Sequence, residues 1–205
     1  MTVYKQAHLH FKKVDTALYR AAKVVEKHLP KKHTKKNNQK LFESLCESIV
    51  SQQLSVKAAD TIYGRLQVAC KGVVSPTSLL ALSPKKMRSC GLSGTKTKSL
   101  KAIARAVREG LTLSELSRMS EEEATNSLTR LYGVGPWTAH MFLMFGCGHD
   151  DIFAPGDLGL VRAIEMLYRK KNPSARTLSA LSKKWQPYRS HACRVLWKYR
   201  DTKVR

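Results

Sequence analysis

Apolar residues recur along most of this chain at the three- and four-residue spacing of an amphipathic helix. From Val14 to Leu29, one helical face collects Val14, Ala17, Leu18, Ala21, Val24, Val25 and Leu29. No strand-like alternation of apolar and polar residues lasts longer than about four residues. The pattern therefore predicts an all-α protein.

Capping residues and glycines mark where the predicted helices begin and end. The stretch 41–70 predicts two helices with a break near 51–55. Ser75-Pro76 and Ser83-Pro84 each place an N-cap before a proline at the first helical position. The segment 85–108 is expected to form helix, glycine-bounded turn and helix.

The second half of the chain carries the same kind of signal. Ser120 and Glu123 form the S-x-x-E pattern of a capping box at the start of a helix. A loop with Pro155 follows that helix and its successor. Further helices are predicted near residues 161–169, 177–185 and 190–199.

The segment LTRLYGVGPWTAHMFLMF at 128–145 joins two predicted helices through a turn with two glycines. Gly133 and Gly135 permit positive φ and close approach of another molecule, because neither has a Cβ. Pro136 gives up only an amide that the first helical turn leaves unpaired. The remaining amides and the helix dipole suit a phosphate oxygen. Taken alone, such a turn more often marks a tight corner between helices, and phosphate binding is favoured only by the rest of the sequence.

The net charge of the chain indicates the chemical class of its partner. Lys and Arg number 37 against 15 Asp and Glu, a net charge of +22. Such self-repulsion opposes compaction, so it indicates a polyanionic partner, and nucleic acid is favoured over an anionic membrane or an acidic protein. The predicted helix-turn-helix segment that begins at residue 85 should contribute a basic stripe facing DNA, formed by Lys85, Lys86, Arg88, Lys96, Lys98 and Lys101. Each of these cations alone could be only a solvated surface charge.

The basic stretch 30–40 has no apolar residue to anchor it. It is expected to be a connection, and either contact with phosphates or a plain solvated loop explains its composition. Asp150 and Asp151, in the loop before Pro155, are interpreted as loop or cap residues.

Several other classes of protein are disfavoured. No apolar run reaches the roughly 20 residues that span a bilayer, and the N-terminus lacks the apolar core of a secretion signal. The five cysteines form no C-x-x-C pair, which excludes a zinc ribbon or a four-cysteine iron–sulfur cluster. Reduced thiols fit a cytoplasmic or nuclear protein. His8 and His10 have strand-like spacing but no third ligand nearby.

Four segments occur in a characteristic order: ESIVSQQLSVKAA, LYGVGPWTAHMFLMF, DIFAPGDLGL and WQPYRSHACRVLW. With them the chain resembles the helix-hairpin-helix (HhH-GPD) DNA glycosylase superfamily over about 41–199, most closely its 3-methyladenine (alkylbase) branch. The resemblance implies one domain with two helical lobes and a DNA-binding cleft. One lobe would span 41–148 with the hairpin at 121–146, and the other 1–40 with 149–205. The extra N-terminal sheet domain of larger relatives has no room here.

The resemblance places Asp157, 22 residues beyond Gly135, at the family's catalytic aspartate. Cleaving an N-glycosidic bond builds oxocarbenium-like charge on the sugar. A single carboxylate can stabilise that charge and orient or deprotonate a water. A base alkylated on a ring nitrogen is already cationic, so it leaves without a proton donor. A helix N-cap is the alternative role of Asp157, and one residue can serve both.

The resemblance also implies a base pocket. Trp137 and Trp197 fall where the family lines it, and an indole face attracts a cationic base by about 1 to 2 kcal/mol. Core packing is the alternative for both. Trp137 occupies the position of the lysine that forms a Schiff base in the family's glycosylase/lyases, which implies a monofunctional hydrolase. Met141 and Leu158 stand where some relatives have aromatic residues, so the base preference stays open.

DNA contacts are implied at two further places. Gln52, Gln53 and Leu54 fall at the family's wedge segment, which fills the gap left by a flipped base; Gln53 is favoured, and a buried turn capping helix ends is the alternative. The hairpin contacts to the DNA backbone would come from Gly133, Val134, Gly135 and Thr138. No side-chain metal or cofactor is expected, although the family's hairpin often holds a monovalent cation through backbone carbonyls.

The sequence thus indicates a monomeric alkylpurine glycosylase of base excision repair acting on double-stranded DNA, with substrates of the N3-methyladenine and N7-methylguanine type. One alternative is a lesion or abasic-site binder that keeps the scaffold without turnover. Another is a binder of acidic proteins or membranes.

Overall fold

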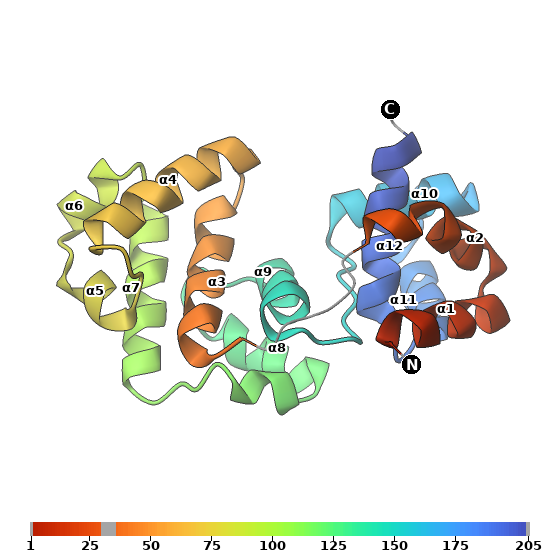
Figure 1. Cartoon of the computed structure of the whole chain (residues 1–205), viewed down its shortest axis with the longest axis horizontal. Coiled ribbons are helices and arrows are strands. Elements are labelled where there is room, and N and C mark those ends of the chain that lie inside the picture. The colour runs from red at the N-terminus through yellow and green to blue at the C-terminus, as the bar shows by residue number, and fades with distance from the viewer. Residues whose placement is uncertain (1, 30–35, 204–205) are drawn as a thin grey trace. The chain divides into compact units, whose positions relative to one another are not determined.

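The chain folds into helices joined by turns, and no strand occurs in the part that the structure describes (Figure 1). The structure is a computed structural model that describes residues 2–29 and 36–203. The prediction of an all-α protein is confirmed. The chain divides into two compact units, one of Met1–Thr34 with His149–Arg205 and one of Lys35–Gly148.

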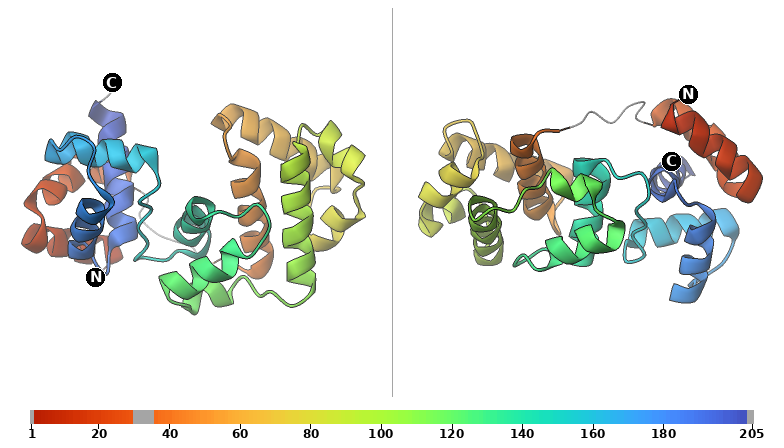
Figure 2. Two further views of the ribbon diagram at one scale, coloured as in Figure 1. Left: turned by 180° about the vertical axis from the view of Figure 1, so that it is seen from behind. Right: turned by 90° about the horizontal axis from the view of Figure 1, so that it is seen from below.

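The Lys35–Gly148 unit is built around α3. Its elements are α3 (Asn38–Ser51), α4 (Val56–Ala69), α5 (Pro76–Ala81), α6 (Pro84–Ser89), α7 (Gly94–Arg108), η2 (Glu115–Arg118), α8 (Glu121–Thr129), α9 (Pro136–Met141) and the π-helix η3 (Phe142–Cys147). α3 contacts α7 on one side and α9 and η3 on the other (Figures 1 and 2). The fully buried side chains of Phe42, Leu45, Ile49, Leu100 and Ile103 form part of its core.

The other unit is organised by α12. Its elements are α1 (Val3–Val14), α2 (Thr16–Val25), η1 (Glu26–His28), α10 (Leu158–Tyr168), α11 (Ala175–Lys184) and α12 (Arg189–Lys203). α12 packs against α2 and α10. The carboxylate of Asp15, the N-cap of α2, accepts hydrogen bonds from Tyr168 Oη (2.6 Å) and from Nε1 of the fully buried Trp185 (3.0 Å). One polar side chain thus links α2, α10 and α11 around the core.

Local signals predicted most helix boundaries correctly. Ser75 and Ser83 are N-caps ahead of Pro76 and Pro84, as expected. Ser120 accepts from the amide of Glu123 and Glu123 reaches back, which confirms the capping box. These boundaries depend on contacts within four residues, so the sequence alone determines them.

Two expectations were wrong near the N-terminus, and a third was wrong for part of its segment. The helix expected from Val14 begins at Thr16, because Asp15 leaves helical geometry to cap α2. The preceding residues form α1, so His8 and His10 lie on a helix and their strand-like spacing has no structural meaning. In the basic stretch 30–40, residues 30–35 lie outside the described residues, and 38–40 belong to α3, capped by Asn37.

A cluster of buried polar rings joins α1 to α12. The rings of Tyr4 and His191 meet edge to face at 4.2 Å between centroids, and Phe11 stacks on His191 at 5.8 Å. Burial, with the neighbouring His8 and Arg194, lowers the pKa of His191 to about 3. Burial likewise lowers the pKa of His8. Both imidazoles are therefore neutral in the folded protein at pH 7.

The depressed pKa of His191 predicts loss of stability in acid. Below its ordinary pKa of 6.5 the unfolded chain binds a proton that the folded chain refuses until about pH 3. The free energy of unfolding is therefore unaffected by the protonation of His191 above pH 6.5 and decreases as the pH drops, by about 2 kcal/mol at pH 5. Urea unfolding at pH 7.5 and pH 5.0 measures it. His191→Phe should lose about 2 kcal/mol less than the wild type between these pH values, and equal losses would contradict the assignment.

Candidate functional site

The two glycines of the 128–145 segment have different structural roles. Gly133 has φ +84°, the left-handed region that favours glycine. A Cβ at Gly133 would overlap the hydroxyl of Ser99 on α7 and lie 2.7 Å from its Cβ. Close approach at this glycine therefore serves packing against α7. Packing against Ser99 thus already requires a glycine here, and the expected contact of its backbone with DNA stays a prediction.

Gly135 faces open space. A Cβ built there would meet no atom within 4 Å, and its φ of −86° is ordinary backbone. As the N-cap of α9 it has no side chain to bond the amides of the first turn. Both glycines permit positive φ, but only Gly133 adopts it, while the open surface belongs to Gly135.

The neighbouring hairpin residues point inward. Val134 is 4% exposed, and its amide donates to Leu131 O at 3.1 Å, which closes the turn. Thr138 is 3% exposed. The predicted backbone contacts at Val134 and Thr138 would therefore have to come from the main chain, since neither side chain reaches the surface.

Gln52 is bonded to the hairpin. Its Nε2 donates to Gly133 O at 3.1 Å and to Thr138 Oγ1 at 2.9 Å. The main-chain oxygen of Gln52 in turn accepts from Lys96 Nζ, which also donates to Val50 O, each at 2.8 Å. Lys96 thereby satisfies carbonyls at the end of α3, and Gln52 fixes the α3–α4 break against the hairpin.

Gln53 and Leu54 are the members of the predicted wedge segment that face outward. Gln53 is exposed and has φ +56°, an uncommon conformation for a residue with a Cβ. Leu54 is 38% exposed. The break at Ser51–Ser55 is confirmed, and it presents these two side chains while Gln52 is tied down.

Trp137 and Met141 lie one helical turn apart on α9. Trp137 is 41% exposed although it stands among apolar residues, and Met141 is half-buried. The chain then continues as the π-helix η3, whose side chains Phe142, Leu143 and Met144 are buried. With 41% of its surface exposed, the Trp137 side chain is not a core residue.

Asp157 is the N-cap of α10, as the alternative interpretation proposed. Its Oδ1 accepts from the Leu160 amide at 2.6 Å and from Trp197 Nε1 on α12 at 2.8 Å. A Cβ at Gly159 would overlap Arg200 Nη1 and lie 3.1 Å from Asp157 Oδ1, so the glycine makes room for the Arg200 guanidinium near the carboxylate. The carboxylate is held in one orientation by two donors and remains partly exposed.

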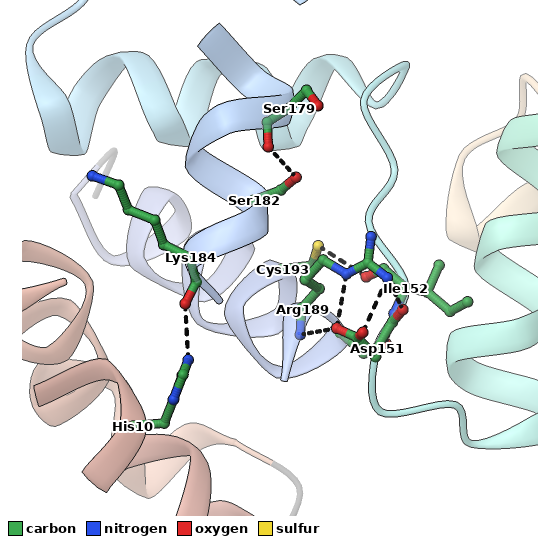
Figure 3. Close-up of polar contacts among 9 residues, drawn as sticks. His10, Asp151, Ile152, Ser179, Ser182, Lys184, Arg189 and Cys193 are labelled. Carbon is green, nitrogen blue, oxygen red and sulfur yellow. Dashed lines mark hydrogen bonds and ion pairs between the residues drawn. The ribbon is translucent and has the colours of Figure 1, made fainter. Parts of the chain in front are cut away.

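The loop that leads to Asp157 is anchored by the segment WQPYRS. Arg189 donates to Asp151 Oδ1 (2.8 Å) and Oδ2 (3.0 Å), a bidentate pair (Figure 3). The Ile152 amide donates to Ser190 Oγ at 2.9 Å. Cys193 Sγ also contacts Ile152 O at 3.7 Å. The interpretation of Asp151 as a cap is confirmed, because its Oδ1 accepts the Arg189 amide at the start of α12.

Leu158 and Trp197 flank the aspartate with different exposure. Leu158, the first residue of α10, is 74% exposed, and Trp197 is half-buried. Asp157, Leu158 and Trp197 belong to one unit. The hairpin, the α3–α4 break, Trp137 and Met141 belong to the other.

Two cations of the predicted basic stripe have structural partners. Lys96 caps α3, and Lys101 Nζ donates to Leu80 O at 2.8 Å and to Leu82 O at the end of α5. Burial lowers the pKa of both lysines. Sequence reasoning missed these roles because the accepting carbonyls lie 19 to 46 residues away.

Comparison with known proteins identifies the arrangement. Residues 46–187 match the model of the HhH-GPD superfamily base excision DNA repair proteins. The chain belongs to this superfamily. DNA-3-methyladenine glycosylase 1 of Schizosaccharomyces pombe is 32% identical over 203 residues, which cover 97% of this chain and 88% of that protein. Full-length similarity of this kind places the chain in the 3-methyladenine DNA glycosylase branch and confirms the resemblance inferred from the motifs.

Solved structures of the superfamily agree with the fold. DNA-3-methyladenine glycosidase from Bacillus halodurans superposes with a TM-score of 0.80 at 32% identity, covering 95% of this chain and 88% of that one. The S. pombe 3-methyladenine DNA glycosylase Mag1, in complex with abasic DNA, also gives 0.80 at 32% identity, covering 94% and 95%. The HhH-GPD fold therefore extends over nearly the whole chain.

Neither a membrane-spanning helix nor a cluster of metal ligands occurs in the described residues. Among the described helices none is long and apolar enough to cross a membrane. Within residues 2–29 and 36–203, no three His, Cys, Asp or Glu side chains are grouped so that they could hold a metal ion.

Proposed function

We propose that the protein is a monofunctional DNA glycosylase that hydrolyses the N-glycosidic bond of alkylated purines in double-stranded DNA. The observation that carries the proposal is the Asp157 carboxylate, oriented by the Leu160 amide and the Trp197 indole and still partly exposed. The S. pombe relative named above is a DNA-3-methyladenine glycosylase, which supports bases of the N3-methyladenine and N7-methylguanine type as substrates.

The proposed chemistry needs one carboxylate. As the bond to a cationic base breaks, its electron pair leaves with the base, and positive charge develops on the sugar. Asp157 stabilises that charge electrostatically and accepts a proton from the water that attacks the sugar carbon. The products are a free base and an abasic site. The Leu160 amide and the Trp197 indole both bind Oδ1, which fixes the orientation of the carboxylate for this role.

DNA binding is proposed to begin at the hairpin. The open surface at Gly135 and the uncapped first turn of α9 offer backbone amides to one phosphate, a contact without sequence preference. Gln53, with Leu54 beside it, is proposed to enter the gap left by the flipped base, and the bonds of Gln52 to Gly133 and Thr138 hold that loop in register with the hairpin.

Trp137 is proposed to contact the base and to set the reaction type. A tryptophan cannot form the Schiff base that a lysine forms with the sugar, so the strand should stay intact after base release. Its partly exposed indole can attract a cationic base, at about 1 to 2 kcal/mol. Met141 and Leu158 are proposed to border the base as well.

Trp137→Leu is expected to slow release of a cationic base selectively. Loss of about 1 to 2 kcal/mol of cation–π attraction corresponds to a roughly 5- to 30-fold lower single-turnover rate for 7-methylguanine. Release of a neutral base such as hypoxanthine, normalised to the wild type, should fall less. Equal losses for cationic and neutral bases would contradict a cation–π role.

A duplex with one 7-methylguanine tests the proposed function. After incubation, the strand should remain intact until alkali cleaves it at the lesion, and borohydride should trap no covalent protein–DNA adduct. Absence of alkali-labile sites would refute the glycosylase assignment. Cleavage without alkali, or a trapped adduct, would refute hydrolysis without a lyase step.

A further inference from the structure

A basic cavity lies between α6 and α7, and none of the hairpin residues lines it. Its volume is about 490 Å³, within the roughly 300 to 1,000 Å³ of ligand sites. Both helices lie in the group of α5, α6 and α7 seen in Figure 1. The lining residues are Pro84, Arg88, Gly94, Thr97, Lys98, Lys101 and Arg105.

The positive charge of this cavity is not compensated locally. No Asp or Glu occurs between Asp60 and Glu109, a stretch that contains ten Lys and Arg residues. In the described part of the chain, the ion pairs found include none of the four cations of the wall. The proximity of Arg105 contributes to the lowered pKa of Lys101, after burial. Such a group of like charges favours an anion among them.

Two polar features of α7 point to the same kind of ligand. α7 begins at Gly94, where a Cβ would meet no atom within 4 Å, so a ligand can approach the start of the helix, although Ser93 Oγ already binds the Lys96 amide. Thr97, 4% exposed, lines the cavity, and its buried hydroxyl has no hydrogen-bond partner. A buried hydroxyl without a partner is uncommon in a folded protein and suits a site whose acceptor is supplied from outside.

We propose that this cavity is a second anchor for the phosphate backbone of duplex DNA, separate from the hairpin. The exposed cations Arg88 and Lys98 contact phosphate oxygens, and Arg105 extends the positive surface by two turns of α7. Lys101 acts mainly as the cap of α5. It adds positive charge to the cavity while its ammonium group stays bonded to the carbonyls of Leu80 and Leu82. Phosphate contacts carry no base information, so this anchor increases affinity for damaged and undamaged duplex alike.

The inference rests on the proposed function only in taking DNA as the partner, and an undamaged duplex tests it independently of base release. The variant Arg88→Gln/Lys98→Gln removes two exposed charges. Lys12→Gln/Arg20→Gln, on α1 and α2, removes the same two charges elsewhere on the surface and is the matched control. Binding of a 25-base-pair duplex is measured from 50 to 300 mM salt, and urea unfolding verifies that both variants fold.

The cavity variant should bind the undamaged duplex at least about tenfold more weakly at 50 mM salt. The slope of log K against log[salt] should become shallower by about 1 to 2, the change for one or two lost phosphate contacts. Losses and slopes equal to those of the control would overturn the proposal, because only general charge would then matter. If the wild-type protein releases no bases while the cavity variant still binds the duplex more weakly than the control, only the proposed catalytic function is refuted.

Discussion

Replacing Asp157 by Asn is expected to lower the single-turnover rate of base release by about 10³-fold while leaving DNA binding within about twofold of the wild type. The structure makes this substitution specific. Asn keeps an Oδ1 that can accept from the Leu160 amide and from Trp197 Nε1, and Asn is as good an N-cap as Asp. Only the negative charge and the capacity to accept a proton are removed.

Controls for Asp157→Asn separate charge from structure. Asp150→Asn removes a carboxylate from an exposed position of the same loop and should leave the rate unchanged. Asp157→Ala also removes the cap and should cost about 1 kcal/mol of stability in addition to activity. A variant Asp157→Asn that releases bases at the wild-type rate would eliminate Asp157 as the catalytic group.

Gly133→Ala is expected to lose stability, whereas Gly135→Ala is expected to lose affinity for DNA. At Gly133 an added methyl meets both positive φ and Ser99, whose Cβ lies 2.7 Å from the built position. Rotating the Ser99 hydroxyl cannot relieve a contact with its Cβ, so α7 or the hairpin must move. Strain and overpacking together predict a loss of about 3 kcal/mol in urea unfolding.

At Gly135 the same methyl enters open space at an ordinary φ, so stability should change by less than about 1 kcal/mol. The methyl would stand before the first-turn amides of α9, and affinity for duplex DNA should fall at least about tenfold. Wild-type stability in Gly133→Ala would contradict the packing against Ser99. Wild-type affinity in Gly135→Ala would contradict the proposed phosphate contact.

The sequence predicted features that depend on near neighbours in the chain. Ser75, Ser83 and Ser120 cap helices as expected, because an N-cap contacts an amide three residues away. The α3–α4 break and the glycine-bounded turn before α7 were predicted for the same reason. α1 was missed because two of its apolar-face positions are occupied by polar rings, Tyr4 and His8, which pack against His191.

Features that depend on distant partners were not predictable in this way. Gln52 bonds residues 81 and 86 positions away, and Lys96 bonds carbonyls on α3. Nothing local distinguishes Lys96 from Lys98, yet the first is tied to α3 and the second lines a cavity. The bidentate pair of Arg189 with Asp151 was likewise not predicted, although Arg189 belongs to the segment WQPYRS that contributed to the family resemblance.

The two hairpin glycines show why motif and geometry are both needed. Four segments in order, with the G-V-G motif in one of them, led to the right family. The coordinates then showed that Gly133 packs against Ser99 and that Gly135 faces open space. The resemblance to known glycosylases likewise indicated Asp157, and the structure added how two donors orient its carboxylate.

Chromatographic identification of free bases released from dimethyl sulfate-treated duplex DNA tests the central proposal most directly. The account predicts that the wild-type protein releases N3-methyladenine and N7-methylguanine well above the rate without protein. The contradicting result is release no faster than in the absence of protein, by a preparation that binds duplex DNA containing an abasic-site analogue.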